Sequence, residues 1–221
     1  MQLRLIELGD TPQAWEAAGF LVEHSADDGA TVTLGSTVLR LDGAGGGFLG
    51  WHLDGLDGDL DGLAPATGPG GDDTRGANTA ADGAAEAGTH PNGISRIDHV
   101  VVRTGDIDRT VTAFEAAGLE VRGGRSTTSY GAPMRQVFFW AGDVILELVG
   151  PDAGEPTTDE PTSIFGLALV ADDLDATGAL LGELLGTPRE AVQAGRRIAG
   201  LRGRDLGISL PVAVMSPHRR G

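Results

Sequence analysis

The hydrophobic pattern of this chain switches repeatedly between the alternation typical of strands and the spacing typical of short helices. In the first part, Thr11 and Pro12 begin a predicted helix, because Thr is a good cap and Pro suits the first helical position. Strands are predicted at Leu3–Leu8 and around residues 20–22, 30–34, 37–41 and 48–53.

The middle and last parts show the same order of elements. In the middle part we predict a strand over 97–103, a helix from Asp106 or Asp108 to Gly118, and strands over 119–125, 135–141 and 144–149. In the last part we predict a strand over 164–170, a helix over 173–185, and strands near 197–202 and 208–215. Each of these two parts is therefore a strand, a helix and then two or three strands.

An internal repeat supports this division. Residues 14–20, Ala-Trp-Glu-Ala-Ala-Gly-Phe, return 99 positions later as residues 113–119, Ala-Phe-Glu-Ala-Ala-Gly-Leu. Both copies are predicted to end a helix and lead into a strand, and Gly118 suits a left-handed C-cap. A weaker third copy, residues 171–175, matches residues 104–108 at an offset of 67.

Composition separates these parts. Residues 64–94 are rich in Gly, Ala, Asp, Thr and Pro and nearly lack large apolar side chains, which predicts a flexible linker. The expected organisation is an N-terminal unit over 1–63, this linker, a middle unit over 95–151, a second linker over 152–162, and a last unit over 163–216.

The 221 residues are 40% hydrophobic, enough to bury a core, and the net charge is −16. Cysteine is absent, which excludes disulfides and thiolate chemistry, and the acidity argues against nucleic acids and anionic membranes as partners. No apolar run is long enough to span a bilayer, and the first residues are typical of a strand rather than a signal peptide. We therefore expect a cytoplasmic protein whose acidic surface serves solubility.

Three motifs carry a family resemblance: Ile-Asp-His-Val-Val-Val over 97–102, Asp-Ile-Asp over 106–108, and Val-Ile-Leu-Glu-Leu-Val-Gly-Pro over 144–151. Together with the element order they resemble the vicinal oxygen chelate superfamily, which includes glyoxalase I, extradiol dioxygenases and drug-binding resistance proteins. The resemblance implies an α+β fold of tandem βαβββ modules, of the glyoxalase, bleomycin-resistance and dihydroxybiphenyl dioxygenase type. Over 95–216 it implies an open, barrel-like sheet around a cleft. Residues 191–199 and 210–213 also look like glyoxalase-like proteins of high-GC bacteria.

Metal-using members of this superfamily take their ligands from the first and last strands of each unit, and His99 and Glu147 match these places in the middle unit. Both are polar residues within apolar strands, where burial is costly without a partner, and both suit Zn, Fe, Mn or Ni. In the last unit the matching positions hold Gly166, with Phe165 one position away, and Ala213. Two of the four expected ligands are thus missing, and the candidate substitutes are His90 and an amide oxygen of Gln136 or Gln193.

Further candidates for ligand binding are Arg135 and Gln136, which precede an aromatic strand, and Arg197, which follows a turn and can grip an acidic group. Alternatively, the aromatic residues fill the core and the arginines are solvated. Two functions remain open. The first is binding of a small organic molecule in the cleft without a complete metal site. The second is a lyase, isomerase or dioxygenase that uses one divalent metal ion on His99 and Glu147. An odd number of units leaves one sheet edge without a mate, so we also expect a homodimer.

Overall fold

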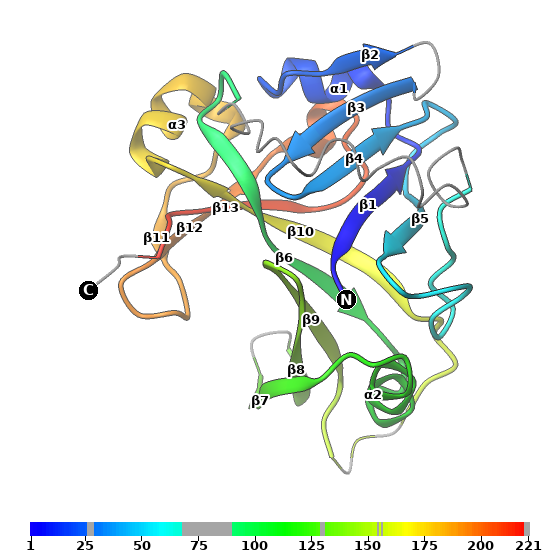
Figure 1. Cartoon of the computed structure of the whole chain (residues 1–221). Coiled ribbons are helices and arrows are strands. Elements are labelled where there is room, and N and C mark those ends of the chain that lie inside the picture. Colours follow the sequence, from blue (N-terminus) through cyan, green and yellow to red (C-terminus); the bar gives the residue numbers. More distant parts are fainter. Residues whose placement is uncertain (26–28, 68–89, 129–130, 154, 156, 219–221) are drawn as a thin grey trace.

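The computed structural model describes residues 1–25, 29–67, 90–128, 131–153, 155 and 157–218. Its strands form a sheet of eight and a sheet of five, with no closed barrel (Figure 1). This arrangement confirms the predicted α+β fold of tandem βαβββ modules. Buried apolar side chains from all three units belong to one core.

The larger sheet combines the middle and last units. The middle unit is β6 (Ile94–Arg103), α2 (Ile107–Ala116), β7 (Val121–Thr127), β8 (Met134–Ala141) and β9 (Val144–Pro151). The last unit is β10 (Ser163–Ala171), α3 (Leu174–Leu181), β11 (Arg189–Glu190), β12 (Arg197–Leu201) and β13 (Val212–Met215), with 3₁₀ turns at Gly182–Leu184 and Gly203–Leu206. In each unit the first and last strands pair in parallel, and β6 pairs antiparallel with β10 to join the units (Figure 1).

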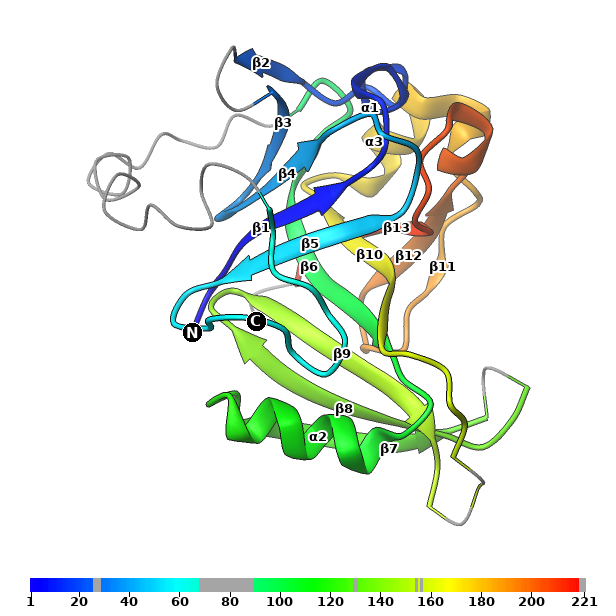
Figure 2. The same cartoon turned by 90° about the vertical axis from the view of Figure 1, so that its right-hand side faces the viewer.

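One face of the middle unit is covered by its own helix. α2 lies along the strands of its own unit (Figure 2). The rings of Phe114 on α2 and Phe139 on β8 lie 5.2 Å apart, and both side chains are fully buried. Strand residues alternate between the two faces of a sheet. The opposite face, which we call the inner face, therefore carries the residues next in sequence to those that α2 covers.

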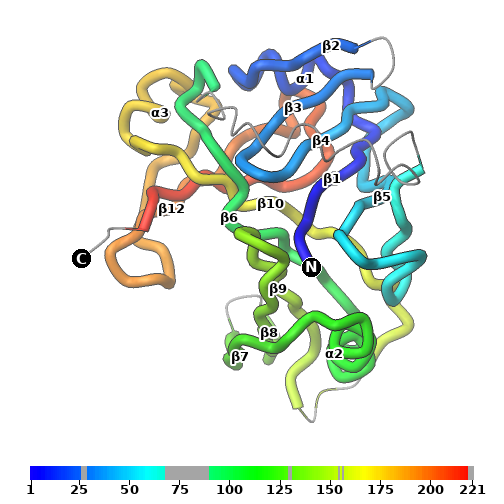
Figure 3. Tube along the Cα trace, viewed as in Figure 1, coloured from blue at the N-terminus to red at the C-terminus, as the bar shows by residue number. Residues whose placement is uncertain are grey.

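The N-terminal unit repeats this topology in the smaller sheet. It comprises β1 (Leu3–Leu8), α1 (Pro12–Ala17), β2 (Glu23–Ser25), β3 (Gly29–Leu34), β4 (Thr37–Leu41) and β5 (Phe48–Leu53), in the sheet order β2-β3-β4-β1-β5. β1 pairs in parallel with β4 and antiparallel with β5. β5 thus takes, beside β1, the place that β10 takes beside β6 (Figure 3).

The sequence repeat encodes the same helix end in two units. Phe20 N donates to Trp15 O at 3.1 Å, and Leu119 N donates to Phe114 O at 3.0 Å. The glycine before each donor has a positive φ, 79° for Gly19 and 93° for Gly118. These are the hydrogen bonds of a Schellman C-cap, which needs a left-handed residue and so favours Gly. The predicted left-handed cap at Gly118 is confirmed.

The strand predicted around residues 20–22 is wrong, since β2 begins only at Glu23. Phe20 packs into the core, with its ring 5.0 Å from that of Trp15 and 5.2 Å from that of His90. The backbone at this point follows the helix cap and the buried ring, so it does not pair until three residues later. The strand predicted over 208–215 is likewise shortened to β13.

Residues 68–89, the central part of the predicted linker, lie outside the described residues. At its start, Trp51 N donates to Ala64 O at 3.2 Å, and Ala66 N donates to Trp51 O at 2.9 Å. Residues 64–66 therefore extend along the outer edge of β5.

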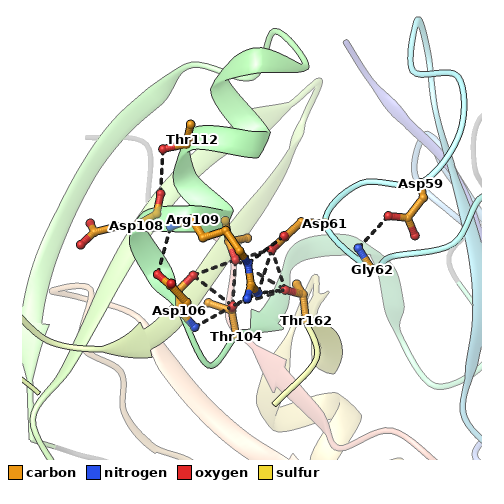
Figure 4. Close-up of polar contacts among 10 residues, drawn as sticks. Asp59, Asp61, Gly62, Thr104, Asp106, Asp108, Arg109, Thr112 and Thr162 are labelled. Atoms are coloured by element: carbon orange, nitrogen blue, oxygen red, sulfur yellow. Dashed lines mark hydrogen bonds and ion pairs between the residues drawn. The ribbon is translucent and has the colours of Figure 1, made fainter. Parts of the chain in front are cut away.

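The segment after β5 is also tied to the middle unit through Asp61. Its carboxylate accepts hydrogen bonds from Thr110 at 2.5 Å, Thr162 at 2.8 Å and Arg109 Nε at 2.9 Å (Figure 4). Burial raises the pKa of Asp61, but these hydrogen bonds outweigh it and lower the pKa. The cluster connects the N-terminal unit to α2 and to the start of β10.

His90 lies at the other end of the predicted linker and is buried. Its Nδ1 accepts from Leu21 N at 3.1 Å, and its Nε2 lies 2.9 Å from Thr33 O, which only accepts. The ring is therefore neutral and protonated on Nε2. Its two hydrogen bonds hold the N-terminal sheet to the start of the middle unit.

None of the described helices is long and apolar enough to cross a membrane.

Burial lowers the pKa of His90, although the bond to Thr33 opposes the shift. A group with a lowered pKa in the folded state stabilises the fold above its ordinary value of about 6.5 and loses that contribution as the pH falls. We expect the free energy of unfolding to decrease below about pH 6.5, and His90→Gln to flatten this decrease. Denaturant unfolding between about pH 5 and 8 measures it, with the exposed His24→Gln as the matched control. Equal slopes in wild type and His90→Gln would contradict this assignment.

Candidate functional site

The inner face of the middle unit brings His99 and Glu147 together. Glu147 on β9 pairs with Val101 on β6 and with Phe138 on β8, so it lies between two strands that share its face. His99 Nε2 lies 3.5 Å from Glu147 Oε2, and the two side chains are only 12% and 10% exposed. Two polar groups are thus nearly buried on strands that are otherwise apolar, at the positions expected from the sequence.

A β-bulge adds a third residue to the site. In the β6–β10 pairing, Ala168 pairs with His99 and Leu169 with Ile97, which leaves Asp98 as the extra residue. A bulge turns neighbouring side chains toward one face. Asp98 Oδ2 consequently lies 2.9 Å from His99 Nδ1.

Asp98 in turn holds Arg196 from the last unit. The guanidinium donates to the two carboxylate oxygens at 2.7 and 3.2 Å, and the side chains of Arg196 and Asp98 are 1% and 4% exposed. Arg196 Nε also donates to Ser216 O at 2.9 Å. This buried ion pair fastens the loop before β12 to the bulge beside His99.

The ion pair determines how His99 is oriented. Burial raises the pKa of Asp98, but hydrogen bonds from His99 and Arg196, together with the charge of Arg196, hold the pKa well below its usual range. An ionised carboxylate only accepts hydrogen bonds, so Nδ1 of His99 carries the proton. The other ring nitrogen, Nε2, is left facing Glu147.

Glu147 receives hydrogen bonds from the opposite side. Gln136 Nε2 donates to Glu147 Oε1, and Arg125 Nε donates to Gln136 Oε1. The Arg125 guanidinium also lies 5.8 Å from the centre of the Phe138 ring. Side chains from β7, β8, β9 and β6 therefore form one polar row across the inner face.

A pocket of about 300 Å³ adjoins this row. It is lined by Val101, Arg103, Ala132, Met134, Val149 and Phe165. Val101 and Val149 follow His99 and Glu147 by two residues, which places them next along the same face, about 7 Å away. The pocket is therefore a mostly apolar hollow, with Arg103 as its one charged lining residue, and the polar pair lies next to it along the same face.

The structure does not bring the other candidates to this pair. Arg135 forms an ion pair with Asp108 of α2, so it lies on the helix-covered face of the sheet, opposite to Gln136. Arg197 pairs with Asp175 at 2.6 Å and lines a separate pocket of about 340 Å³. His90 is bonded at both ring nitrogens between the first two units.

Three residues of the site went unrecognised in the sequence: Asp98, Arg196 and Arg125. Asp98 is adjacent to His99, and a second polar residue in an apolar strand is a visible signal. Arg196 directly precedes the candidate Arg197, and the sequence does not show which of the two arginines turns inward.

No family model and no curated protein matches the chain. Solved structures do. A mutant 4-hydroxymandelate synthase from Streptomyces coelicolor is 14% identical to this chain, with a TM-score of 0.62. The match covers 100% of this chain and 94% of the synthase chain. A fusion of a xylose isomerase-like TIM barrel with 4-hydroxyphenylpyruvate dioxygenase is 12% identical, with a TM-score of 0.58. The match covers 100% of this chain and 49% of the fusion protein. A methylmalonyl-CoA epimerase from Mycobacterium tuberculosis is 19% identical, with a TM-score of 0.45. The match covers 57% of this chain and 90% of the epimerase chain.

The chain has the vicinal oxygen chelate fold. Its strand register identifies the four positions that correspond between units. Glu147 pairs with Val101, two residues past His99, and Ala213 pairs with Ala168, two residues past Gly166. Gly166 is therefore the counterpart of His99, and Ala213 is the counterpart of Glu147.

The residues present do not fit a four-ligand metal site of this fold. Ala213 has no donor atom, and a Cβ on Gly166 would lie 2.7 Å from Pro211 O, which leaves no room for a side chain. Within the described ranges, no group of three or more His, Cys, Asp or Glu side chains could hold a metal ion. Of these four positions, only His99 and Glu147 carry a side chain with a donor atom for a metal.

The Asp98–Arg196 ion pair can be tested by removing one charge. We expect Asp98→Asn to lower the free energy of unfolding by about 3–5 kcal/mol, because it leaves the Arg196 charge buried without its partner. Asp175→Asn, which breaks the exposed pair of the neighbouring arginine, is the matched control and should change stability little. Urea unfolding of both variants measures the difference, and equal losses would contradict a special role for the buried pair.

Proposed function

We propose that the protein binds a small organic molecule on the inner face of the middle unit, with His99, Glu147 and Gln136 as polar contacts and without a complete metal site. The observation that carries the proposal is the 3.5 Å approach of two nearly buried polar groups beside an apolar pocket. Small-molecule sites typically combine an apolar hollow with a few fixed polar groups.

The directions of the hydrogen bonds indicate what the ligand supplies. Asp98 takes the proton-bearing side of His99, so a neutral ring presents an acceptor at Nε2. Glu147 receives Gln136 at one oxygen and presents the other, Oε2, to His99. Two acceptors facing each other are stabilised by a donor placed beside both. A ligand hydroxyl, amide or ammonium group meets this need.

The alternative is a lyase, isomerase or dioxygenase that uses a divalent metal ion on His99 and Glu147. The arrangement of an imidazole nitrogen and a carboxylate oxygen favours it, since both atoms suit Zn, Fe, Mn or Ni. A two-ligand site binds metal weakly, however, and neither Gly166 nor Ala213 adds a ligand. The bonds already made by His90 leave it without a free lone pair for a metal.

Glu147→Gln separates these functions. It preserves shape but removes the charged acceptor, so fragments that contact the site in an NMR screen should bind at least about tenfold more weakly. Glu115→Gln on the exposed side of α2 is the control. Elemental analysis of protein purified without chelator or nickel resin should find less than one equivalent of metal. One equivalent that is lost in Glu147→Gln would favour the metal enzyme, and fragment binding unaffected by Glu147→Gln would contradict the proposed site.

A homodimer is part of the proposal. The sheet edge that the sequence leaves without a mate is the outer edge of β5, and the backbone of residues 64–66 already forms hydrogen bonds along it. The more open edge is β7, whose residues 121–126 are exposed at the end of the larger sheet. Pairing of β7 with its copy would cover this edge. Light scattering should give twice the mass of one chain, and a monomeric mass would contradict it.

A further inference from the structure

We infer that the ligand of this site is an organic anion whose apolar body fills the pocket and whose acidic group binds Arg103. This inference rests on the proposed function and adds the chemical class of the ligand. It is carried by the placement of Phe165, by the single charge in the pocket lining, and by an internal carboxylate that already lies on Arg103.

Phe165 reaches the pocket through a second β-bulge. In the β6–β10 pairing, Ile164 pairs with Val102 and Gly166 with Val101, so Phe165 is the extra residue. It remains 44% exposed although it is a large aromatic side chain next to a buried core. A bulge that turns an aromatic ring toward a hollow, and leaves it partly uncovered, is typical of a surface that meets another molecule.

The pocket lining is apolar except at one point. Among the described residues that line it, Arg103 alone is charged, and the others are aliphatic, aromatic or methionine side chains. Arg103 lies on the inner face two residues past Val101, at the end of the pocket away from His99. Arginine forms forked, charge-assisted hydrogen bonds with carboxylates and phosphates. A ligand anchored here extends its body toward Glu147.

Glu160 shows that Arg103 accepts a carboxylate in this position. Glu160 Oε2 lies 3.0 Å from an Arg103 terminal nitrogen, and the side chains are 56% and 50% exposed. The segment is kept nearby by Thr158, whose backbone N donates to Gly105 O at 3.0 Å. Because exposed ion pairs contribute little stability, a ligand acid can displace Glu160 at small cost.

The test uses three probes that share one body, an aromatic ring whose hydroxyl supplies the donor expected beside His99 and Glu147. They are 4-(3-hydroxyphenyl)butanoate, its neutral amide and 4-(3-hydroxyphenyl)butylamine. We expect calorimetry to show that the acid binds about tenfold more tightly than the amide, and the amine most weakly. Arg103→Gln should bring the affinity of the acid down to that of the amide and leave the amide unchanged. Glu160→Gln should tighten the acid, because it removes the competing carboxylate.

Arg122→Gln is the matched control, since Arg122 forms a comparable exposed pair with Glu120 outside the pocket. Equal affinities of acid and amide in the wild type would overturn the inference, as would equal effects of Arg103→Gln and Arg122→Gln. Failure of all three probes, while other fragments still depend on Glu147, would overturn the ligand class and leave the proposed function standing. Absence of any fragment that depends on Glu147 would instead contradict the proposed function itself.

Discussion

The antiparallel pairing of β6 with β10 is the constraint on which the rest of the structure depends. It makes one sheet of two units, and two of its three bulges lie where the inner face carries its side chains. The bulge at Asp98 turns a carboxylate beside His99, and the bulge at Phe165 turns an aromatic ring into the pocket. A regular ladder would send one of each pair of neighbours to the opposite face.

The buried Asp98–Arg196 ion pair crosses the junction that this pairing creates. Burying two charges is expensive, and an apolar pair of similar volume is often at least as stable. What the ion pair adds is geometry, because a carboxylate fixed by arginine fixes the proton of His99 on Nδ1. The polar row thus depends on a residue from the last unit, although all four of its own side chains come from the middle unit.

The three units use the same topology differently. The middle unit has an imidazole and a carboxylate at the two corresponding positions on its inner face. The last unit has Gly166 and Ala213 there, and Pro211 closes the space beside Gly166. In the N-terminal unit, Glu7 and Arg40 form a buried ion pair across β1 and β4. The fold therefore does not need polar groups at these positions, since paired strands and the shared core hold the units together.

The sequence by itself determined the repeated topology and the place of His99 and Glu147. Helix caps, glycine turns and alternating strands are local signals, so the end of α2 at Gly118 could be predicted from neighbouring residues. Only the tertiary structure decided the strand register, and with it the partners of each polar side chain. The bulge at Asp98, the inward turn of Arg196 and the use of His90 as a link between sheets depend on contacts between residues far apart in the chain. Such contacts depend on which strands pair, and neither residue type nor spacing along the chain specifies that pairing.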